Sequence, residues 1–130
     1  MNWWPVTLKP AWKLTGAAES TLALLQRGFD GDEEVTPAYR DFLPSIDGHP
    51  VTALEPRQVA AVAEALRGIA PEAVRAVVPS EPDRVEAQLG SLARTVRGEL
   101  AGQLAQQHAV LRDFSAEAAR RRLAVVLWWD

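Results

Sequence analysis

Four carboxylates stand close together in the first third of the chain. They are Asp30, Asp32, Glu33 and Glu34. Clustered carboxylates on a flexible turn can bind a hard cation such as Ca²⁺, but this spacing lacks the alternate ligands and the distant glutamate of an EF-hand loop. We therefore predict no metal site and interpret the segment as a solvated acidic turn. The functional alternative is a docking patch for a basic protein, because complementary charge raises association rates.

A second group of side chains follows in a stretch interrupted by prolines. These side chains could line a small-molecule site within residues 30–50. They are Tyr39, Arg40, Asp41 and His49. In Asp47-Gly48-His49 the aspartate could orient the imidazole, but a catalytic dyad also needs a nucleophile. The nearby hydroxyls of Ser45 and Thr52 have no nucleophile elbow or oxyanion motif beside them. We assign no catalytic residue and favour a non-enzymatic protein.

The residue types limit the remaining chemistry. The chain has no cysteine, which excludes disulfides and thiolate chemistry. Neither G-x-G-x-x-G nor a P-loop occurs, so we predict no cofactor. His108 falls beside an apolar helical stripe, and we interpret it as a histidine satisfied by a nearby hydrogen-bond acceptor. The net charge of −3 argues against a nucleic-acid surface, for which a basic patch is expected.

Length and composition predict one globular domain over residues 1–130. The hydrophobic fraction is 48% and the charged fraction 24%, as in ordinary folded proteins. The longest apolar run is far too short to cross a bilayer, so we expect no membrane partner. The first residues lack the basic and apolar regions of a signal peptide, and we therefore expect a cytoplasmic protein.

Apolar residues that recur at three and four positions predict four helices. They span residues 17–27, 56–67, 71–78 and 81–121. Gly31 is placed just past the first helix, and Gly68 is expected to end the second as a left-handed cap. Ser80 is the expected N-cap of the last helix, which is too long for such a domain, so we expect a break near Gly98 or Gly102. Residues 30–54 are predicted to be mostly loop, with at most a short strand or one helical turn.

The apolar run at the C-terminal end predicts a β-strand over residues 123–127, followed by Trp128 and Trp129. We expect this strand to be central and covered on both faces, so that Val126→Asp should unfold the domain. Residues 3–8 are its predicted partner, at an edge because Pro5 cannot donate a backbone hydrogen bond. The predicted fold class is therefore α+β: helix-rich, with a small sheet that pairs the C-terminal strand with the N-terminal segment. Either tryptophan, if exposed, would mark an interface.

Two segments carry a family resemblance. Residues 53–66 read A-L-E-P-R-Q-V-A-A-V-A-E-A-L, and residues 111–126 read L-R-D-F-S-A-E-A-A-R-R-R-L-A-V-V. They resemble the helix opening "L-T-P-E-x-V-A-x-V-A-x-A-L" and the ending "L-R-x-F-Y-x-x-A-A-x-R-G-x-A-V-L" of the YfbM-like family, a bacterial domain of unknown function. The resemblance covers roughly residues 50–130 and implies a terminal strand in a small sheet against helices. Arg121 or Arg122 stands where that family tends to have glycine.

These observations favour a non-enzymatic protein-binding domain. One concrete version is an immunity- or antitoxin-like protein that neutralises a basic toxin through an acidic loop. Its predicted contact residues are the carboxylates of the acidic turn together with Asp41, Asp47, Trp128 and Trp129. The alternatives are a small-ligand-binding protein or enzyme that uses residues 30–50, and a homo-oligomeric structural protein joined through its sheet edge or its long helix.

Overall fold

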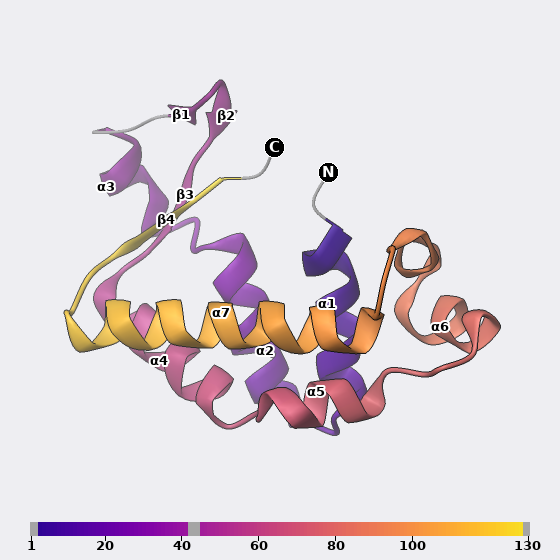
Figure 1. Ribbon diagram of the computed structural model, residues 1–130. Coiled ribbons are helices and arrows are strands. Elements are labelled where there is room, and N and C mark those ends of the chain that lie inside the picture. The colour runs from indigo at the N-terminus through magenta and orange to yellow at the C-terminus, as the bar shows by residue number, and fades with distance from the viewer. Residues whose placement is uncertain (1–2, 42–44, 129–130) are drawn as a thin grey trace.

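The computed structural model describes residues 3–41 and 45–128. Helices dominate this part of the chain, as Figure 1 shows. Their bounds are α1 Trp3–Leu14, α2 Glu19–Asp30, α3 Thr36–Arg40, α4 Pro56–Arg67, α5 Pro71–Val77, α6 Pro82–Leu89, the 3-10 helix η1 Ser91–Thr95 and α7 Leu100–Arg120. The strands are β1 Ser45–Ile46, β2 His49–Pro50, β3 Thr52–Leu54 and β4 Val125–Leu127. The predicted helix-rich α+β class is confirmed.

The longest helix, α7, organises the packing. It crosses the view of Figure 1, with α4 and α5 packed below it and the strands above. The hydrophobic core around α7 contains fully buried side chains from most of the helices. The largest are Trp12, Leu8, Leu25, Leu66, Leu89 and Leu104. Because α7 touches α1, α4 and α5, it holds both halves of the chain around one core.

The predicted N-terminal strand is wrong: residues 3–14 form helix α1. Trp4, Leu8 and Trp12 recur every four residues and face the core, which is the period of a helix. Pro5 lies in the first turn, where a backbone N–H would have no intrahelical partner, so it is tolerated there. The content of tryptophan, valine and threonine resembled that of a strand, but the spacing of the apolar residues decided the outcome.

The C-terminal strand forms, but its predicted partner and its central place are wrong. β4 pairs antiparallel with β3, with Ala53 opposite Val126, in a sheet of two strands. The three residues of β4 are all partly exposed. Val125 and Leu127 face the core, while Val126 lies on the opposite side of the strand. β4 is therefore an edge strand with one covered face.

The segment over residues 30–54 contains more structure than the prediction allowed. It forms the short helix α3, the β1–β2 hairpin and β3. The hairpin has a two-residue loop, Asp47-Gly48, with positive φ at both residues, as a type I′ turn requires. At the start of the segment, Gly31 ends α2 as predicted, with φ 73°. A Cβ there would lie 2.6 Å from Thr52 Oγ1, so this close contact requires glycine.

Helix ends in the second half agree with the prediction in part. Pro56 and Pro71 are the first residues of α4 and α5, as predicted. Gly68 has a right-handed φ of −69°, so the predicted left-handed cap is wrong. Glu81, not Ser80, precedes α6 as its N-cap, because Pro82 takes the first helical position. The break in the last predicted helix spans residues 90–99 and includes Gly98 at φ 91°; Gly102 lies inside α7.

Candidate functional site

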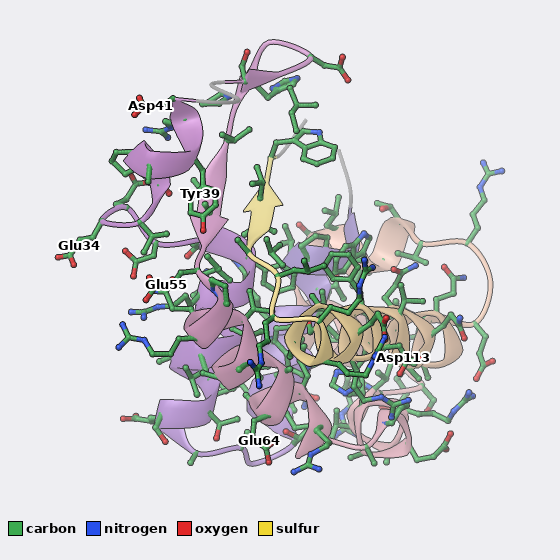
Figure 2. All side chains as sticks on the ribbon, turned by 90° about the vertical axis from the view of Figure 1, so that its left-hand side faces the viewer. Glu34, Tyr39, Asp41, Glu55, Glu64 and Asp113 are labelled. Atoms are coloured by element: carbon green, nitrogen blue, oxygen red, sulfur yellow. The ribbon has the colours of Figure 1, made fainter. Side chains whose placement is uncertain are left out.

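The charge of the chain is unevenly distributed. Residues 30–55 contain seven carboxylates and one arginine, so their net charge is −6, whereas the rest of the chain is net +3. We call residues 30–55 the acidic segment. Figure 2 shows Glu34, Asp41 and Glu55 on the left of the view, whereas Glu64 lies at the bottom and Asp113 at the right. Three carboxylates of the acidic segment therefore lie on the same side of the molecule.

Asp32 is the structural centre of the acidic turn rather than a free surface charge. Its Oδ1 accepts a hydrogen bond from the Glu34 N–H at 2.8 Å, and its Oδ2 accepts one from Gln58 Nε2 at 2.6 Å. The Glu34 N–H is the largest cause that lowers the pKa of Asp32, and Gln58 and Arg27 lower it further. Asp32 therefore joins the turn to α4, and its carboxylate is already occupied within the fold.

Backbone and side-chain hydrogen bonds hold the rest of the acidic segment against β3. The buried Thr36 hydroxyl donates to Asp32 O at 2.6 Å and accepts from the Ala53 N–H at 3.0 Å. Arg40 Nε donates to Val51 O at 2.9 Å. These contacts fix helix α3 on the sheet, so the carboxylates around it project from a rigid support.

The other predicted acidic residues are exposed at the surface. Asp30 accepts a hydrogen bond from Gln26 Nε2 at 2.7 Å. The remaining four form no ion pair with any residue in the described ranges. They are Glu33, Glu34, Asp41 and Asp47. An open depression of about 730 Å³ beside the turn is lined by both acidic and basic side chains, including Arg27 and Arg57. These four carboxylates lie on the turn, just after α3 and on the hairpin.

The residues proposed to line a small-ligand site do not converge on a described cavity. Tyr39 and Arg40 are half-buried on α3, and Asp41 is exposed just after it. His49 is half-buried on the β1–β2 hairpin. Of these side chains, Arg40 donates a hydrogen bond from Nε to the backbone carbonyl of Val51. This contact explains Arg40 as a structural residue.

His108 lies fully buried on α7 between two hydrogen-bonding partners. Trp12 Nε1 donates to His108 Nδ1 at 2.9 Å, and His108 Nε2 lies 2.7 Å from Ile69 O. Because an indole only donates and a carbonyl only accepts, the neutral ring must carry its proton on Nε2. Burial is the main cause that lowers its pKa, and Arg112 lowers it further. The prediction of a satisfied histidine is confirmed, although the residue lies deeper than a boundary position.

An apolar groove lies between α7 and the β3–β4 sheet. It is narrow, about 40 Å³, and is lined by the following residues among others: Leu54, Val62, Leu111, Phe114, Val125 and Leu127. Phe114 is 57% exposed beside it and Trp128 is 46% exposed at the end of β4. Trp129 lies outside the described residues. Phe114 and Trp128 are therefore large apolar side chains that reach the surface near this groove.

Three further observations restrict the chemistry. In the described part of the chain, no group of three or more histidine, aspartate or glutamate side chains is placed to hold a metal ion. Among the helices of residues 3–41 and 45–128, none combines the length and apolar character needed to cross a bilayer. Nor is there a described buried side-chain nitrogen or oxygen atom without a hydrogen-bond partner.

Comparison with known proteins adds no homologue. No protein-family model, curated protein or solved structure matches this chain. The resemblance to the YfbM-like family therefore stays a prediction.

Proposed function

We propose that the protein is a non-enzymatic protein-binding domain whose acidic segment docks onto a basic protein. The observation that carries this proposal is a set of four exposed carboxylates without ion pairs, which lie on the turn, just after α3 and on the hairpin. Their uncompensated charge creates an attractive field for a cationic surface. The hydrogen bonds of Asp32, Thr36 and Arg40 support the proposal because a rigid scaffold reduces the entropy lost on binding.

An immunity- or antitoxin-like role is the concrete version of this function. A basic toxin would be blocked by a surface that covers its positive charge. The acidic segment would supply the electrostatic attraction, and Trp128 would supply an exposed aromatic anchor of the type found in binding hot spots. The small-ligand alternative gains no support from the position of Arg40.

The test compares two triple variants of equal charge. Glu33→Gln, Glu34→Gln and Asp41→Asn together neutralise the acidic segment but leave the structural Asp32 unchanged. The control combines Glu64→Gln, Glu72→Gln and Asp113→Asn, whose carboxylates form ion pairs elsewhere on the surface. Immobilised wild-type protein captures partners from a lysate, and each captured protein is identified by mass spectrometry and then purified.

The expected partner is basic. Its association rate should fall by about tenfold or more for the first variant, remain near the wild-type value for the control, and decrease with added salt. Equal binding by the two variants would contradict a role for the acidic segment.

A further inference from the structure

The hydrogen bonds of Ala53 define the two edges of the β3–β4 sheet. Its N–H donates to Thr36 Oγ1 at 3.0 Å, and its C=O accepts from the Asp32 N–H at 2.8 Å. Both groups therefore point away from β4. In an antiparallel ladder this makes Ala53 and Val126 a non-hydrogen-bonded pair, so the N–H and C=O of Val126 also point outward, toward the other edge.

The two edges differ in how they are covered. The outer edge of β3 is closed by Asp32 and Thr36, and Arg40 binds the adjacent Val51 carbonyl. The outer edge of β4 carries the backbone groups of Val126 without a partner in residues 3–41 and 45–128. An uncovered edge is a template for pairing with another strand.

We propose that β4 pairs antiparallel with β4 of a second copy of this chain, about a two-fold axis at Val126. The product is a four-stranded sheet in the order β3-β4-β4-β3. Val126 of each copy supplies both an outward N–H and an outward C=O, so the two residues satisfy each other. In this register Val125 faces Leu127 of the second copy, and the small Ala124 faces the large Trp128, so the side chains also fit in size.

Charge favours a second copy over an unrelated strand. The chain enters β4 from Arg121 and Arg122, which are exposed and form no ion pair within the described residues. At the opposite end of β4, Leu127 pairs with Thr52, and β3 leads back to the hairpin turn at Asp47. Figure 1 shows β4 rising from the end of α7 toward this hairpin. Antiparallel pairing therefore brings the basic end of each β4 toward the acidic hairpin of the other copy.

A single introduced cysteine tests the two-fold axis directly, because the natural chain has none. In a hydrogen-bonded antiparallel pair the Cα atoms lie about 5.5 Å apart, a separation that a disulfide spans. Val126→Cys should therefore form a covalent dimer under mild oxidation. Ser20→Cys, exposed on α2, is the control and should form no covalent dimer.

Val126→Pro tests the edge without the crosslink. Proline removes the outward N–H of Val126 and no hydrogen bond to β3. Sedimentation over a micromolar-to-millimolar series should show that wild-type protein dimerises reversibly and that Val126→Pro stays monomeric. Thermal unfolding of dilute protein should give both proteins the same melting temperature. Asp47→Asn should weaken the dimer and make it less sensitive to salt.

Three results would overturn the proposal. They are a wild-type protein that stays monomeric throughout the series, a dimer that Val126→Pro leaves intact, and a Val126→Cys protein that crosslinks no faster than the control. If Val126→Pro proves unfolded, the cysteine experiment decides alone, since it leaves the backbone hydrogen bonds unchanged. Binding of a basic partner is tested at Glu33, Glu34 and Asp41, which the pairing of β4 does not use, so either proposal can fail while the other stands.

Discussion

The buried contact between Trp12 and His108 shows how a single residue can couple distant parts of the chain. The two hydrogen bonds of the His108 ring connect α1, α7 and the turn after α4. Protonation would place a second N–H on Nδ1, against the Trp12 N–H, so the folded protein must keep the ring neutral. The histidine is therefore part of the core, and a change in its protonation state would lower the stability of the fold.

Stability should consequently fall as the pH falls below the ordinary histidine pKa of 6.5. The folded-state pKa is lowered, so between the two values the unfolded chain binds a proton that the folded chain does not. The contribution is fully present above 6.5 and decreases in acid by up to about 1.4 kcal/mol per pH unit. Urea unfolding from neutral to mildly acidic pH measures this slope.

One variant separates His108 from other acid-sensitive groups. His108→Gln should lower stability at neutral pH and remove the slope just below pH 6.5. A slope that persists in His108→Gln would assign the effect to other groups. The carboxylate of Asp32 has a lowered pKa as well, but it loses its contribution only in stronger acid.

At the scale of elements, the end of α7 shows a local conflict between residue type and backbone. Arg122 has φ 55°, and its N–H donates to Ala119 O, while the Leu123 N–H donates to Ala118 O. This pair of bonds is a Schellman motif, in which glycine is the favoured residue at the left-handed position. The YfbM-like pattern has glycine at Arg121 or Arg122, and of the two only Arg122 adopts a positive φ.

Arg122→Gly should therefore stabilise the fold by about 1 kcal/mol, because the left-handed conformation costs a residue with a Cβ roughly that amount. Arg121→Gly removes the same charge at a right-handed position with φ −87°, so it should destabilise by up to about 1 kcal/mol. The urea midpoint of dilute protein measures both. A shift in the same direction for the two variants would mean that charge, rather than backbone conformation, determines the effect.

Elements were predictable where local signals agreed with the tertiary packing. Pro56 and Pro71 marked the starts of α4 and α5 because proline suits the first helical position wherever the helix packs. Residues 3–8 had signals for both strand and helix, and burial of Leu8 and Trp12 decided between them. Helix α3 and the β1–β2 hairpin are too short to leave a periodic pattern. Contacts with β3 position α3, and the two hairpin strands contact each other.

At the scale of the whole molecule, the core lies between the helices and not around β4. Leu104 on α7 is fully buried, whereas Val126 is partly exposed on the outer side of an edge strand. Leu104→Ala should therefore cost about 2–5 kcal/mol. Val126→Asp should cost about 1 kcal/mol or less in dilute protein, which replaces the expectation of unfolding.

Thermal or urea unfolding of the two variants distinguishes these architectures. If Val126→Asp unfolds the domain while Leu104→Ala is tolerated, the centre of the fold is the C-terminal strand after all. A larger loss of stability in Leu104→Ala than in Val126→Asp agrees with a core organised by α7. Both variants are measured at low concentration, where pairing between copies contributes little to stability.

The sequence by itself determined the helix-rich α+β class, the starts of α4 and α5 at proline, the absence of thiol chemistry and the presence of an acidic segment. These properties depend on composition and on spacing along one element. Only the tertiary structure decided which carboxylates of the acidic turn accept hydrogen bonds within the fold. Asp32 and Glu34 look alike in sequence, but it is Asp32 that accepts a hydrogen bond from Gln58. The tertiary structure also decided the partner of β4, since strand pairing joins residues far apart in the chain and leaves no local pattern.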